Sequence, residues 1–128
     1  MENQKEIEKV IKVLERINQD FLSQGIIESV CSITDGVKKL IFKDCGRYIS
    51  IIQEGKSVEV VVYSEIVNLS CDMLEKKSTI EEGRLTEEYV QNLLRVIDLS
   101  LDKLAELGDI DAKKAEDQKI IIRNNLGR

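Results

Sequence analysis

The chain has 128 residues, of which 42% are hydrophobic and 34% charged, and its net charge at neutral pH is −5. This composition fits one globular domain and excludes a disordered chain, and no apolar run reaches the roughly 18 residues of a membrane helix. The N-terminal segment lacks the apolar stretch of a secretory signal, so we expect a cytoplasmic protein with no membrane partner.

The first predicted element is an amphipathic helix over residues 4–23. Apolar residues recur there at alternating steps of three and four, which places them on one helical face. They are Ile7, Val10, Leu14, Ile17 and Phe21. Ile11 widens this apolar stripe, and Gly25 suits the left-handed conformation that commonly ends a helix.

Three turn signals at ten-residue spacing divide residues 26–64 into four runs rich in β-branched residues. The signals are Asp35-Gly36, Asp44-Cys45-Gly46 and Glu54-Gly55-Lys56. Turn residues between short β-branched runs are typical of hairpins. The segment therefore predicts a four-stranded antiparallel β-meander.

Alternation along these strands separates two faces of the predicted sheet. The expected core face carries Ile27, Cys31, Ile33, Leu40, Phe42, Tyr48, Ile52, Val58, Val60 and Val62. The opposite face, called here the mixed face, combines apolar and basic residues. Its candidate contact residues are Lys39, Ile41, Lys43, Arg47, Ile49, Ile51, Val61 and Tyr63. An antiparallel sheet facing water is normally more polar, so something should cover this face.

Helical patterns follow the predicted sheet. A short helix is expected from Ile66 to about Lys77, and a long one over 86–107, ending at Gly108. For 112–128 the sequence leaves a helix capped by Asp111, a short strand and a flexible basic tail as alternatives. The predicted fold is a single α+β domain, 1–128, with two or three C-terminal helices packed on one sheet face.

No group of residues stands at a spacing that familiar chemistry requires. The chain has no histidine, and the spacing of its three cysteines matches no metal knuckle. Asp109 and Asp111 resemble the start of a calcium loop, but its sixth and twelfth positions would be Lys114 and Ile120 instead of glycine and glutamate. We therefore expect no catalytic, metal-binding or cofactor-binding residue, and no enzyme.

An acidic stripe runs along the predicted 86–107 helix. Asp98, Asp102 and Glu106 stand at steps of four, on one helical face. A solvated face explains them, and a docking surface for a basic partner is the functional alternative.

Three alternatives remain for what covers the mixed face: a helix of the same chain, a second copy of the protein, or a ligand such as single-stranded nucleic acid. We expect a non-enzymatic protein-interaction module, a small scaffold, adaptor or accessory subunit, that binds through the mixed face and the acidic stripe. We also expect a homodimer, formed through either the helices or the sheet. The alternative is an accessory subunit binding single-stranded nucleic acid, with Tyr63 stacking on a base. Its phosphate contacts would be Lys39, Lys43, Arg47 and the basic residues of 112–128.

Overall fold

The computed structural model describes residues 2–26, 28–80 and 87–125, with side chains described at 4–26, 32–75 and 87–125. Six helices account for nearly all of these residues. They are α1 Glu2–Ser23, α2 Glu28–Lys43, α3 Cys45–Gln53, α4 Val58–Ile80, α5 Glu87–Glu106 and α6 Ala112–Asn125. The described ranges contain no strand, so the predicted α+β fold with a four-stranded meander is wrong.

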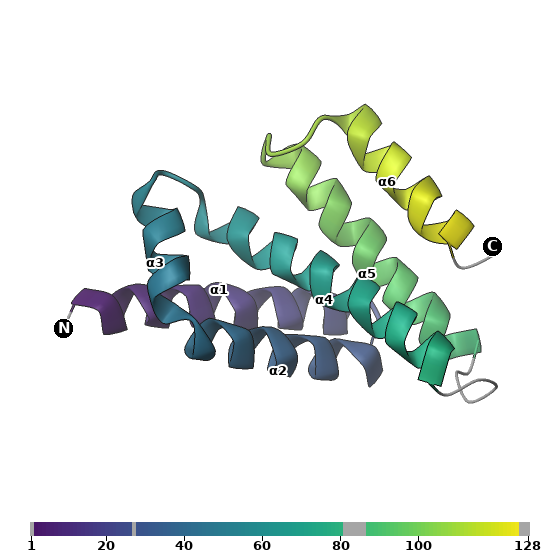
Figure 1. Cartoon of the computed structure of the whole chain (residues 1–128), viewed down its shortest axis with the longest axis horizontal. Helices are drawn as coiled ribbons and strands as arrows, with labels where there is room; N and C mark the ends of the chain where they lie inside the picture. Colours follow the sequence, from purple (N-terminus) through teal and green to yellow (C-terminus); the bar gives the residue numbers. More distant parts are fainter. Residues whose placement is uncertain (1, 27, 81–86, 126–128) are drawn as a thin grey trace.

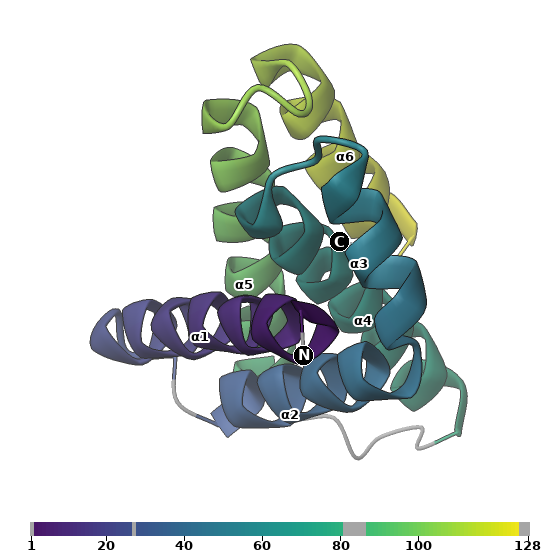
Figure 2. The same cartoon turned by 90° about the vertical axis from the view of Figure 1, so that its left-hand side faces the viewer.

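Apart from the short α3, which stands across α1 and α2, each helix runs roughly opposite in direction to the long helix before it (Figure 1). α1 and α2 form a hairpin, α4 packs on both of them, and α5 returns along α4. The short α3 turns the chain from α2 into α4, and α6 folds back along α5. Figure 2 shows the α5–α6 pair rising from the layer that α1 and α2 form. None of the described helices is long and apolar enough to span a bilayer.

The segment predicted as a sheet is helical, and its apolar spacing is compatible with the period of a helix as well as with that of a strand. Ile33, Val37 and Ile41 stand four residues apart, which returns to the same side of a strand and nearly to the same side of a helix. All three are fully buried in α2. The same step of four continues through α4, whose fully or almost fully buried positions include Val62, Ile66, Ser70 and Leu74.

Two of the three turn signals mark helix ends, and the third lies inside a helix. Asp44 directly precedes α3, and Gly55, with φ +104°, follows its end. Gly36 lies within α2, where a Cβ atom would stand 2.6 Å from Leu69 Cδ2 of α4. The glycine therefore lets the Leu69 side chain approach the α2 backbone.

The helical fold also corrects the two predicted sheet faces. Leu40 and Phe42 were expected in the core but are exposed. Ile41, Ile49, Val61 and Tyr63 were expected on the mixed face, for which a cover was sought, and they are buried in the chain's own core. Successive residues of a helix lie 100° apart instead of 180°, so alternation assigns only some side chains correctly. Four residues of the predicted core face are buried as expected: Ile33, Tyr48, Val60 and Val62.

The first and fifth helices agree with the sequence-based prediction. α1 and α5 cover the predicted ranges 4–23 and 86–107 within two residues at each end. Gly25 and Gly108 follow them with φ +84° and +81°, the left-handed conformation that a helix end favours. Of the alternatives for 112–128, the helix is the one the structure shows, and residues 126–128 lie outside the described ranges.

Candidate protein-interaction site

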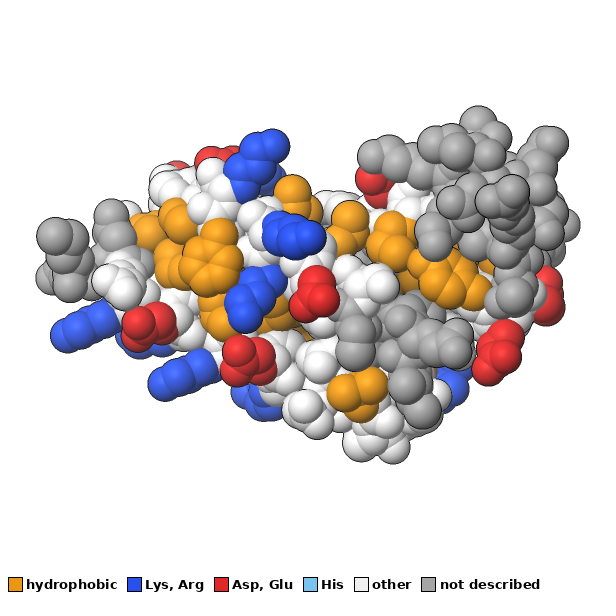
Figure 3. Space-filling view, turned by 90° about the horizontal axis from the view of Figure 1, so that it is seen from below, with side chains coloured by type: hydrophobic (Ala, Val, Ile, Leu, Met, Phe, Trp, Pro, Cys, Tyr) orange, Lys and Arg blue, Asp and Glu red, His pale blue; other side chains and the backbone are white. Residues whose placement is uncertain are grey.

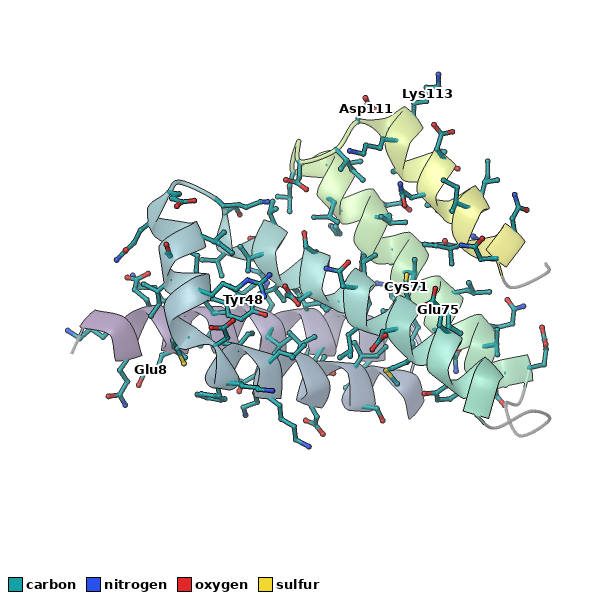
Figure 4. All side chains as sticks on the ribbon, viewed as in Figure 1. Glu8, Tyr48, Cys71, Glu75, Asp111 and Lys113 are labelled. Carbon is teal, nitrogen blue, oxygen red and sulfur yellow. The ribbon has the colours of Figure 1, made fainter. Side chains whose placement is uncertain are left out.

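The basic residues of the predicted mixed face lie on helical surface. Lys39, Lys43 and Arg47 are exposed along the end of α2 and the start of α3. The guanidinium carbon Cζ of Arg47 lies 5.4 Å from the centre of the Tyr48 ring. Nη2 of Arg47 lies 3.8 Å from Oε1 of Glu65 on α4. Figure 4 shows Tyr48 on the side of α3 that faces α4. Burial and the Glu65 carboxylate raise the pKa of Tyr48.

The apolar residues of the predicted mixed face belong mainly to the core. Ile51 is half-buried against it, and Tyr63 is only 4% exposed. Burial raises the pKa of Tyr63, because the phenolate would be poorly solvated there. A buried ring offers no face for stacking on a nucleic-acid base.

The acidic stripe of α5 is largely paired within the chain. The Arg123 guanidinium of α6 donates to both carboxylate oxygens of Asp98, at 3.0 and 2.6 Å. Lys119 Nζ lies 2.7 Å from Asp102 Oδ1, and Lys103 pairs with Glu106 at 3.1 Å on α5 itself. Asp98 and Asp102 are therefore paired with basic residues of the chain's own C-terminal helix, where a separate basic partner was the functional alternative.

α6 joins the bundle through few apolar contacts. Ala115 is its only buried residue within the described range, and Ile122 is half-buried against the core. Asp111 caps its start, because Asp111 Oδ1 accepts the Lys114 backbone N–H at 2.7 Å (Figure 4). Ile120 and Ile121 are 56% and 49% exposed. Ion pairs and one cap therefore hold much of α6 in place.

An apolar groove of about 700 Å³ lies between the N-terminal half of α1, the end of α2 and the start of α3. We call it the Phe42 groove. Its lining comprises Gln4, Ile7, Glu8, Ile11, Lys12, Glu15, Lys38, Phe42, Cys45, Gly46 and Ile49. Phe42 is the most prominent of these, because its aromatic side chain is 55% exposed. Figure 3 shows hydrophobic side chains gathered at this end of the molecule, with charged side chains around them.

The local helix geometry explains why Phe42 remains uncovered. α2 ends at Lys43 and α3 begins at Cys45, so the chain turns away directly after Phe42. The Cys45 thiol donates to the Phe42 carbonyl oxygen, with Sγ 3.3 Å from O, and lies half-buried at the groove. On α1, Ile11 is partly exposed beside the buried stripe and forms part of the groove wall.

The sequence-based prediction missed this groove because it placed Phe42 in the core. A usable signal was Ile11, which lies outside the three-four stripe of α1 and extends its apolar surface. A second signal was an aromatic residue two positions before Asp44, the residue at which the chain turns.

The described residues include no group of three or more histidine, cysteine or acidic side chains that could hold a metal ion. Burial and the nearby Glu75 carboxylate raise the pKa of the Cys71 thiol on α4 (Figure 4), which disfavours the reactive thiolate. The absence of enzymatic activity stays a prediction.

Comparison of the chain with protein-family models, curated proteins and solved structures gives no match.

Proposed function

We propose that this protein is a non-enzymatic protein-interaction module, a small adaptor or accessory subunit, that binds its partner through the Phe42 groove. The observation that carries the proposal is the exposed aromatic ring of Phe42 beside the apolar side chains of Ile7, Ile11 and Ile49. Aromatic residues in apolar pockets are the commonest anchors of protein interfaces.

The energetics favour a partner at this position. Covering apolar surface contributes about 25 cal/mol per Å², and aromatic rings supply large areas at a low cost in conformational entropy. The lining of the groove extends along α1 from Gln4 to Glu15, a length of about 17 Å at 1.5 Å per helical residue. An elongated open groove of this length suits a peptide segment.

Nucleic-acid binding has less support. The recognition sheet that it required does not occur in the described residues, and Tyr63 is buried. Lys119 and Arg123, two of the cations expected to contact phosphates, are paired with carboxylates of α5. The homodimer and the cytoplasmic location stay predictions.

Selection from a displayed peptide library tests the proposal. Peptides selected on the wild-type protein should lose binding to a Phe42→Asp variant, because a carboxylate in the groove cannot be covered by apolar side chains. Leu107→Asp is the matched control, since Leu107 is exposed but lies outside the groove. Failure to enrich any peptide would refute the proposal, and so would enriched peptides that bind the Phe42→Asp variant as tightly as the wild-type protein.

A further inference from the structure

We infer that the Phe42 groove binds an amphipathic helix of a partner protein, and that the charges on its rim set the direction in which this helix lies. The inference rests on the proposed function and adds the conformation, the charge pattern and the polarity of the bound segment.

The lining of the groove favours a helix over an extended peptide. An extended peptide needs hydrogen-bond partners for its backbone, which bound strands usually find at a sheet edge. The described residues contain no strand, and the groove floor consists of apolar side chains. A helix satisfies its own backbone groups and can present apolar residues at steps of three and four to such a floor.

The length of the groove fits a helix of about three turns. Ile7 and Ile11 stand one turn apart on α1, and Phe42 and Ile49 line the groove from α2 and α3. A partner helix lying along α1 would place its apolar stripe between these two walls, with Phe42 as the central aromatic contact.

The two walls differ in charge. Glu8, Lys12 and Glu15 line the groove from α1, whereas Lys38 lines it from α2 (Figure 4 labels Glu8). Glu8, Glu15 and Lys38 are exposed, and the ion pairs found among the described residues do not involve them. Lys12, between the two glutamates, is likewise exposed and outside these ion pairs, so the α1 wall carries a net charge of −1 and the α2 wall +1. Two cations of α1 next to the groove residues are paired: Lys9 with Glu6 at 3.3 Å, and Arg16 with Glu59 of α4 at 3.1 Å.

Charge complementarity therefore specifies the partner. Its basic residues should face Glu8 and Glu15 along α1, with an uncharged residue opposite Lys12, and its acidic residues should face Lys38. Turning a helix end for end, with its apolar stripe still in the groove, exchanges the two flanks. A helix with one basic and one acidic flank consequently matches the rim in one direction only.

Two synthetic 15-residue helical peptides with the same apolar stripe and exchanged flanks test this inference. In the first, the basic flank faces α1 when the peptide runs parallel to α1. In the second, the basic flank faces α1 when the peptide runs antiparallel to α1. A nitroxide at each peptide N-terminus broadens the NMR signals of nearby backbone amides, so the position of the label reports the direction.

With the first peptide we expect broadening near Gln4, and with the second near Glu15. A Glu8→Lys, Glu15→Lys, Lys38→Glu variant should reverse both directions. A control peptide with glutamine at all flank positions should bind about tenfold more weakly, as expected for a few exposed ion pairs. Phe42→Asp should abolish binding of every peptide.

The outcomes separate the inference from the proposed function. Peptides that bind through Phe42 but keep the same direction on the wild-type protein and on the Glu8→Lys, Glu15→Lys, Lys38→Glu variant would overturn the inference alone. Absence of binding of the helical peptides to the wild-type protein, or binding that survives Phe42→Asp, would overturn the inferred helix-binding groove. The proposed function falls with it only if the library selection also yields no peptide that depends on Phe42.

Discussion

Ile41 and Phe42 are neighbours in the sequence but have opposite environments. Ile41 is fully buried between helices, whereas the Phe42 ring is 55% exposed in the groove. The 100° step between successive helical residues produces this contrast at the end of α2. The pair therefore distinguishes a residue needed for stability from one available for binding.

Alanine substitutions at these two positions should have very different effects. Ile41→Ala should lower the free energy of unfolding by about 2–5 kcal/mol, because it leaves a cavity in the core. Phe42→Ala should lower it by less than about 1 kcal/mol, since much of its surface already contacts water. Urea denaturation followed by circular dichroism measures both values, and equal losses would contradict the assigned environments.

Ser100 offers a second test at the residue scale. It is fully buried on α5, and its hydroxyl has no hydrogen-bond partner among the described residues. Ser70, also fully buried, donates from Oγ to the Ile66 carbonyl oxygen at 2.6 Å.

Ser100→Ala should raise the free energy of unfolding by about 1 kcal/mol, because it removes an unsatisfied buried hydroxyl. Ser70→Ala is the matched control and should give a smaller gain or a loss, since it removes a hydrogen bond. Chemical denaturation of both variants decides the comparison. A larger gain at Ser70 would show that the Ser100 hydroxyl is satisfied in solution.

At the scale of elements, α6 depends on electrostatics more than the other helices do. Lys119→Glu combined with Arg123→Glu should release α6 from α5, because each ion pair becomes a repulsion with Asp102 or Asp98. We expect a loss of about 1–2 kcal/mol in docking free energy. Hydrogen exchange should become fast across 112–125 and stay slow in α1.

A Lys113→Glu, Lys114→Glu variant provides the control for this experiment. Both side chains are exposed, and the pair changes the net charge by the same amount. Similar acceleration of exchange in the two variants would show that overall charge, and not the specific ion pairs, governs the docking of α6.

The same contacts predict how α6 responds to pH. The hydrogen bond with Asp102 raises the pKa of Lys119 above the ordinary value of 10.5. The charged ammonium is therefore stabilised in the folded state, and this stabilisation is complete below the unfolded pKa and lost as the pH rises through the folded pKa.

We expect α6 to lose helical circular dichroism above about pH 10.5, the ordinary lysine value. Tyrosine ionisation also begins near this pH, so Lys119→Arg is the necessary control. Arginine keeps its charge at higher pH and should preserve the helical signal. Identical alkaline transitions in both proteins would exclude Lys119 as the cause.

The elements also show how far the sequence could predict the fold. α1 and α5 were predictable because their steps of three and four match only a helical period, and a glycine follows each of them. α2 was not, because the step of four from Ile33 to Val37 to Ile41 fits both periods. Tertiary packing decides such segments, and it outweighs the strand preference of β-branched residues.

The candidate site was predictable only in part. Lys39, Lys43 and Arg47 were expected at the surface and lie there. The acidic stripe was identified from spacing alone, but its pairing with α6 depends on the turn between the two helices. The Phe42 groove depends on where three helices meet, and this arrangement cannot be read from the period of any one of them.

At the scale of the whole molecule, the Phe42 groove and α6 occupy different ends of the bundle (Figure 1). The groove lies where α1, α2 and α3 meet, whereas α6 packs along α5. A partner in the groove should therefore bind without displacing α6. In the described part of the chain, the fold thus combines a buried core with the open apolar surface of the Phe42 groove.

Photo-crosslinking at Phe42 in intact cells is the most direct test of this central claim. With p-benzoylphenylalanine at position 42 we expect one discrete adduct, which an added Ile11→Asp substitution should abolish because Ile11 lines the same groove. An adduct of twice the chain mass would identify a second copy as the partner and thereby the homodimer. The same probe at Leu107, which is exposed outside the groove, should give no such adduct. No adduct at position 42, or the same adducts from both positions, would contradict the role of the Phe42 groove.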